Sequence, residues 1–237
     1  MDYKTDVPII INSRDRVTPL ECLVSWLLDA GYSNIMVLDN DSSYPPLIEY
    51  YDQIEGLVHV ERLGKNLLSK ALWCWPPAHQ SIHAPFVYTD SDVIPTETCP
   101  HDVVEFLAKV AHHLGNPYKV GMSLKIDDLP DHYIPAPQVR KWEGERMWTK
   151  PIGELEGVTV YSAGVDTTFA LYTEFRPFTL DAVRVGEPYT ARHVDWYRDS
   201  MNPTEEQSYY EAHAATGCHS WGLSECFSKA VIKHCEG

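Results

Sequence analysis

The stretch that decides the fold is Ala84-Pro85-Phe86-Val87-Tyr88-Thr89-Asp90-Ser91-Asp92. Apolar and β-branched residues run without alternation into two carboxylates, a pattern typical of a strand that is buried on both faces of a parallel sheet. Open α/β sheets bind ligands at the carboxyl ends of such strands. The stretch therefore predicts a central strand over 84–89, with Asp90 and Asp92 at its ligand-binding end.

Shorter strands and helices alternate before this stretch, which predicts a mostly parallel sheet covered by helices. Thr18, Pro19 and Glu21 resemble a helix start with Thr18 as its N-cap, and Gly31 is placed to end that helix. The expected strands are 7–12, 35–38, 57–60 and 84–89, and the expected helices are 18–31, 45–51, one after 65–66 and one opened by Pro100.

The second half of the chain is less regular. Residues 125–156 lack a clear period and are interpreted as a long functional loop or a small helical insert. Strands are expected at 158–161 and 168–172, and a helix capped by Thr204 is expected to follow. We predict a single domain over 1–237, with a nucleotide-sugar-binding half (1–125) and a half (126–237) that binds the acceptor and completes the metal site.

Composition narrows the classes of partner. The 19 Lys and Arg residues against 34 Asp and Glu residues give a net charge of −15, which would repel nucleic acid and anionic lipid. No apolar run approaches the roughly 18 to 20 residues that span a bilayer, and the N-terminus does not resemble a signal peptide. We expect a cytoplasmic protein without a membrane span. An acidic protein that binds a diphosphate would need a divalent cation between them.

Asp90 and Asp92 are the two residues that we expect to bind a metal ion. Carboxylates at positions i and i+2 of an extended segment point to the same side, so Asp90 and Asp92 can face one cation. Oxygen ligands suit Mg²⁺ or Mn²⁺. A cation held in this way can neutralise the charge on a departing nucleoside diphosphate.

The chain resembles GT-A glycosyltransferases, and its first 125 or so residues are similar to glycosyltransferase family 2. The matching stretches are IIINSRDR (9–16), VLDNDSS (37–43), ERLGKN (61–66) and VYTDSDVIP (87–95). The resemblance implies a Rossmann-like GT-A fold and a hexosyltransferase that uses a nucleoside-diphosphate sugar, such as a UDP-sugar, and a hydroxyl acceptor on a saccharide or small molecule.

The resemblance also implies roles for individual residues. Asp39 is expected near the base, Asn12 or Arg14 near the nucleoside, and Lys65 or Lys70 at the phosphates. Asp92 is expected to bind the diphosphate through the metal, and Asp90 through the ribose or the metal.

The sequence departs from the family 2 pattern in its second half. The QxxRW stretch is absent, and Ala191-Arg192-His193-Val194-Asp195-Trp196-Tyr197 takes its place. Because many GT-A enzymes bring a late His to the metal, His193 is the candidate third ligand. Asp166, between two expected strands, is preferred to Asp195 as the general base. Trp142 and Trp148 are candidates to stack on the acceptor sugar, or else pack the long loop.

Alternatives remain open. A haloacid-dehalogenase-type phosphatase also follows a hydrophobic strand with DxD, although that family normally places its nucleophile on the first strand. A protein that binds a sugar nucleotide without catalysis would have the same fold. The cluster of Cys218, His219, Cys226, His234 and Cys235 is a conceivable zinc site, although its spacing matches no zinc knuckle or ribbon. The sequence leaves the donor sugar, the acceptor and the stereochemical outcome undecided.

Overall fold

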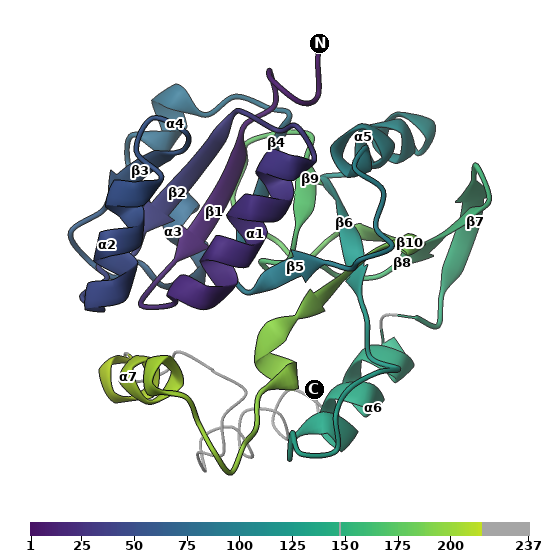
Figure 1. Ribbon diagram of the computed structural model, residues 1–237. Coiled ribbons are helices and arrows are strands. Elements are labelled where there is room, and N and C mark those ends of the chain that lie inside the picture. Colours follow the sequence, from purple (N-terminus) through teal and green to yellow (C-terminus); the bar gives the residue numbers. More distant parts are fainter. Residues whose placement is uncertain (147, 215–237) are drawn as a thin grey trace.

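A computed structural model describes residues 1–146 and 148–214, and one ten-stranded sheet runs through this part of the chain (Figure 1). The strand order is β3-β2-β1-β4-β9-β6-β10-β8-β7, and β5 pairs with β10 off this path. The strands are β1 (Ile9–Ser13), β2 (Ile35–Asp39), β3 (His59–Arg62), β4 (Phe86–Asp90), β5 (Val93–Pro95), β6 (Lys119–Leu124), β7 (Pro151–Leu155), β8 (Val158–Ser162), β9 (Ala170–Tyr172) and β10 (Val183–His193).

The helices flank this sheet. They are α1 (Val17–Asp29), α2 (Pro45–Gln53), α3 (Ala71–Cys74), α4 (Ala78–Ser81), α5 (Val103–His113), α6 (Ala136–Arg146) and α7 (Glu205–His213), with 3-10 turns η1 (Leu68–Lys70) and η2 (Val194–Tyr197). In Figure 1, α1, α2 and α5 lie on the near face of the sheet, and α3 and α4 lie behind it. Among the described residues, no helix is both long and apolar enough to cross a membrane.

The sheet has a regular and an irregular half. β3, β2, β1 and β4 are all parallel neighbours. Beyond β4, the antiparallel strand β9 inserts before β6, and β10 pairs with β6 in parallel but with β8 and β5 in antiparallel. The predicted α/β class is therefore confirmed: helices flank a Rossmann-like parallel half, and the C-terminal half is less regular.

The structure has two apolar cores, one on each face of β1. They explain why apolar and polar residues do not alternate along this strand. Ile9 and Ile11 pack into the larger core, beneath α1, α2 and α5, whereas Ile10 packs into a second core with Leu72 of α3 and Tyr88 of β4. A strand with both faces covered must be apolar at every position. This burial fixes β1 and β4 as neighbours in the interior of the sheet, and their parallel pairing sets both carboxyl ends on the same side of it.

One local prediction was wrong, and one long strand was not expected from the sequence. Helix α1 begins at Val17 and not after a Thr18 cap; the Thr18 N–H donates to Glu206 Oε1 of α7 at 2.9 Å. Strand β10 was missed because Gly186 and Pro188 interrupt its pattern, and the strand accommodates them with an irregularity between Val185 and Thr190.

Other predictions at the ends of helices hold. Gly31 follows α1 with a φ of +87°, the left-handed conformation that favours glycine. Thr204 caps α7, and Gln207 completes the capping box.

Residues 125–156 contain α6 and β7, so the interpretation as a small helical insert is correct in part. The Cys218–Cys235 cluster lies outside the described residues.

Candidate functional site

The site begins where the central parallel strands end. The register pairs Asn12 of β1 with Asp90 of β4, and Ser13 with Asp39 of β2. The Asn12 Nδ2 donates to Asp90 Oδ1 at 3.1 Å. Strand pairing therefore brings together three of the residues that the sequence predicted for the donor site.

Asp90 is held tightly by its surroundings. Its second carboxylate oxygen accepts a hydrogen bond from Thr167 Oγ1, and its N–H donates to the Thr167 carbonyl at 2.8 Å. Burial, together with the nearby charge of Asp92, raises the pKa of Asp90 well above its ordinary value. A positive charge at this point would relieve the repulsion between the two carboxylates.

Asp92 faces His193 where β5 pairs with β10. The Asp92 Oδ2 lies 3.7 Å from His193 Nδ1, and the side chains are only 16% and 17% exposed. The His193 ring is stacked on Trp196 with centroids 4.9 Å apart, and its Nδ1 is buried without a hydrogen-bond partner. The pairing of β5 with β10, which sets His193 opposite Val93, delivers the imidazole to the acidic pair.

A ready three-residue metal centre is not present in the described residues: no three His, Cys, Asp or Glu side chains there converge closely enough to hold an ion. Asp92 and His193 approach one another, while Asn12 and Thr167 occupy the Asp90 carboxylate. The site thus offers two possible metal ligands, the Asp92 carboxylate and the His193 imidazole. Asp90 lies close to Asp92 in the chain, but its carboxylate is already hydrogen-bonded.

The two candidate bases differ sharply. Asp166 is exposed in the β8–β9 loop, directly before Thr167, and its charge acts on Asp90. Asp195 is buried and forms a close ion pair with Arg16. Burial alone would raise the pKa of Asp195, but Arg16 outweighs it and holds that pKa below its ordinary value. Asp166 is accessible to an acceptor hydroxyl, whereas Asp195 is engaged as a structural anion.

Asp39 is also engaged in the structure. It is fully buried, pairs with Arg62 Nε at 2.6 Å and accepts a hydrogen bond from Tyr51 Oη at 2.9 Å. The Asp39 carboxylate therefore joins the end of β2 to β3 and α2.

The loop after β1 is covered by α7. The Arg14 Nη2 donates to the His213 carbonyl at 3.0 Å, and its Nε lies 3.4 Å from Asp15 Oδ2. Tyr44 and Tyr209 rings meet with centroids 4.8 Å apart. Figure 1 shows α7 below the lower ends of β1 and α1. Arg14 thus faces α7 at this edge of the sheet.

The remaining predicted residues lie at the margins of the site. Lys65 and Lys70 are exposed, and the Lys70 Nζ lies 4.8 Å from the Phe178 ring centroid. Trp142 of α6 stacks with Arg146 at 4.2 Å. Trp148 packs edge-on against Tyr161, and its buried Nε1 has no hydrogen-bond partner.

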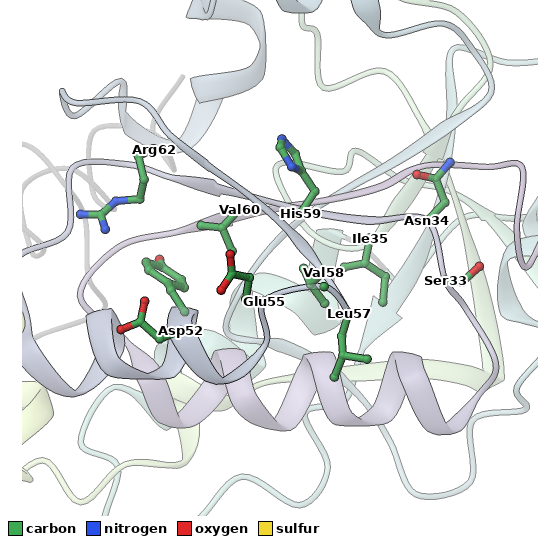
Figure 2. Close-up of a pocket in the computed structure, with 12 residues that line it drawn as sticks. Ser33, Asn34, Ile35, Asp52, Glu55, Leu57, Val58, His59, Val60 and Arg62 are labelled. Atoms are coloured by element: carbon green, nitrogen blue, oxygen red, sulfur yellow. The ribbon is translucent and has the colours of Figure 1, made fainter.

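Two hollows lie near these elements. One of about 240 Å³ is lined by Trp148 together with residues of β10 and of the segment that follows β6. The larger, about 640 Å³, lies along the edge strand β3 and the end of α2, as Figure 2 shows. Arg62, which pairs with Asp39, lines the larger hollow, but Asp90 and Asp92 do not. The larger hollow is therefore not the acidic site.

Sequence reasoning missed two contributors to the site. Thr167 binds Asp90, and Arg16 neutralises Asp195. The polar run Asp166-Thr167-Thr168 after an expected strand was a signal for the first. No local pattern pointed to the second, because 179 residues separate Arg16 from Asp195.

Comparisons with known proteins give no family assignment. Neither a protein-family profile nor a curated protein matches the chain. Fifty-one solved chains match its structure. One of them is apo UDP-glucose pyrophosphorylase, with a TM-score of 0.41 and 10% sequence identity, over 87% of this chain and 99% of that chain. A likeness at that TM-score carries no argument about the site.

Proposed function

We propose that this protein is a metal-dependent glycosyltransferase that moves a sugar from a nucleoside-diphosphate donor, such as a UDP-sugar, to a hydroxyl acceptor. The observation that carries the proposal is the approach of Asp92 to His193, where β5 pairs with β10, beside the half-buried Asp90. The acidic pair also lies at the carboxyl ends of parallel strands, where α/β folds bind nucleotides.

We propose that a divalent cation binds between Asp92 and His193. The unpartnered Nδ1 of His193 and the repulsion between Asp90 and Asp92 both favour a cation at this point. Asp92 and His193 would hold Mn²⁺ or Mg²⁺, with Asp90 behind them. A bound cation would supply Lewis-acid stabilisation of the charge on the departing diphosphate.

The protein's own side chains would provide the remaining chemistry. Asp166, exposed beside Asp90, would accept the proton of the acceptor hydroxyl. Asn12, at the end of β1, would position the donor, and Asp39 and Arg62 would form the floor of the nucleoside site. Arg14, Lys65 and Lys70 would supply positive charge at its rim.

The acceptor would lie on the side of α6 and β8. Trp148 offers an apolar ring and an unsatisfied N–H beside a hollow, which suits the apolar face and a hydroxyl of a sugar. Trp142 is covered by Arg146 and would contact the acceptor less directly.

We expect UDP to bind measurably tighter when Mn²⁺ is present, because the acidic pair repels a bare diphosphate. Isothermal titration with UDP, with and without Mn²⁺, measures this difference. A screen of sugar nucleotides for metal-dependent release of nucleoside diphosphate then tests catalysis. Binding without turnover of any donor would favour a non-catalytic sugar-nucleotide-binding protein. Phosphate release without any preference for nucleoside diphosphates would favour a haloacid-dehalogenase-type phosphatase.

His193→Ala is expected to weaken Mn²⁺ affinity by more than about tenfold, because losing even an outer-sphere partner of a metal ligand typically costs that much. Titration of Mn²⁺ into each variant measures the change. His59→Ala, an exposed histidine on β3, is the matched control and should bind Mn²⁺ like the unaltered protein. Equal affinity in the His193 and His59 variants would remove His193 from the ligand set.

A further inference from the structure

A buried lysine lies beneath the loop that carries Asp166. Lys119, the first residue of β6, has no exposed surface. Its Nζ lies 4.0 Å from the Phe178 ring centroid and within 5.2 and 5.6 Å of the rings of Tyr172 and Tyr118. An ammonium enclosed by aromatic faces is attracted to them, but it has lost its hydration. Such a residue is rarely placed inside a protein without a specific partner.

The polar partners of Lys119 point towards the candidate site. Its Nζ donates to the Asp166 main-chain carbonyl at 3.5 Å and to Tyr172 Oη at 3.4 Å. On the other side of the same loop, Thr167 binds Asp90 through its hydroxyl and its carbonyl. Residues 166 and 167 are thus held between Lys119 and Asp90.

Two further contacts fix the loop to the sheet. The Arg184 Nε donates to the Gly164 carbonyl at 2.9 Å, and Arg184 itself is neutralised by the buried Glu143 at 3.0 Å. Gly121 of β6 leaves room for Val165, because a Cβ there would lie 2.8 Å from the Val165 side chain. The charge of Arg184 is therefore paired with the buried carboxylate of Glu143. By contrast, the two hydrogen bonds of Lys119 go to uncharged groups, a main-chain carbonyl and a tyrosine hydroxyl.

We propose that Lys119 is a positioning residue: its ammonium holds the Asp166 carbonyl from beneath and so fixes Asp166 beside Asp90. The proposal rests on the proposed role of Asp166 as the base. Lys119 does not touch the substrate in this arrangement and acts through the loop.

The charge on Lys119 is sensitive to pH near neutrality. Burial lowers its pKa to about 7, and the nearby cations Arg184 and Lys70 act in the same direction. The acidic groups that face it, Asp166 and Asp181, oppose this change, and Tyr118 and Tyr172 complete its surroundings. Protonated Lys119 holds the carbonyl through a charge-assisted hydrogen bond, which weakens as the pH rises through this value.

Lys119→Met tests the proposal, with Lys109→Met on the exposed face of α5 as the matched control. We expect the Lys119 variant to lose roughly 10- to 100-fold in kcat while the donor KM stays within about twofold, because a displaced base affects chemistry more than binding. The unaltered protein should lose kcat as the pH rises above about 7, and the variant should lack that decline. Lys119→Arg, which stays charged, should retain activity at higher pH.

Amide hydrogen exchange gives a readout that needs no donor. Exchange in residues 163–169 should be faster in Lys119→Met than in Lys109→Met, with β1 and β4 unchanged. Unchanged kcat, pH profile and loop exchange would overturn the proposal, as would faster exchange throughout the sheet, which would mark a purely structural role. If the unaltered protein turned over no donor, the proposed function would fail, while loop exchange would still show whether Lys119 holds the loop.

Discussion

Replacing Asp92 with Asn is expected to reduce metal-dependent release of nucleoside diphosphate by about 1000-fold. Lewis-acid assistance is worth several kcal/mol, and each ~1.4 kcal/mol corresponds to a tenfold change in rate. The substitution keeps the size of the side chain and removes the charge that, with His193, would hold the cation. The measurement is kcat at saturating donor over a range of Mn²⁺ concentrations.

Asp29→Asn is the matched control, because it makes the same chemical change at the exposed end of α1. It should leave kcat and the Mn²⁺ dependence unchanged, and circular dichroism should show both variants to be folded. Full metal-dependent turnover by Asp92→Asn would mean that the proposed mechanism is wrong. The fold would stand in that case, since the two apolar cores within residues 1–146 and 148–214 are built from other side chains.

Replacing Arg16 with Met is expected to lower the free energy of unfolding by about 3–5 kcal/mol. The Arg16 and Asp195 side chains are only 8% and 5% exposed, and removing Arg16 leaves the buried Asp195 carboxylate without its close ion-pair partner. Met is close in length to the Arg stem, so packing is largely preserved. Urea denaturation at neutral pH measures the loss.

Two further variants separate this ion pair from packing. The double variant Arg16→Met/Asp195→Leu, which leaves no charge behind, should recover most of the loss. Lys109→Met, at a surface ion pair with Glu105, should leave the free energy of unfolding nearly unchanged. If the double variant were no more stable than Arg16→Met, a buried unpaired charge would not be the cause.

The pH dependence of this ion pair has a definite sign. Because Arg16 holds the pKa of Asp195 below its ordinary value, the pair stabilises the protein above the ordinary carboxyl pKa, and this contribution is lost as the pH falls through the lowered value. Arg16→Met should therefore reduce the part of acid sensitivity that arises from Asp195.

The sequence by itself determined the parallel half of the fold. Continuous apolar runs identified β1 and β4, because strands covered on both faces must be apolar throughout, and the polar residues after each run marked the strand ends. The sequence placed Asn12 and Asp90 at the ends of two strands, and the pairing of β1 with β4 in the structure then brought their side chains together. Local patterns suffice here because each strand's burial and direction can be inferred from a few consecutive residues.

Only the tertiary structure decided the roles of residues whose partners lie far along the chain. Asp195 and Asp166 were both candidate bases in the sequence, yet Arg16 pairs with the first, and the second stays exposed in the loop that Lys119 contacts. The approach of His193 to Asp92 depends on β10, whose Gly and Pro hide its strand character. Burial and ion pairing depend on distances in space, and a linear pattern does not specify which distant side chains meet.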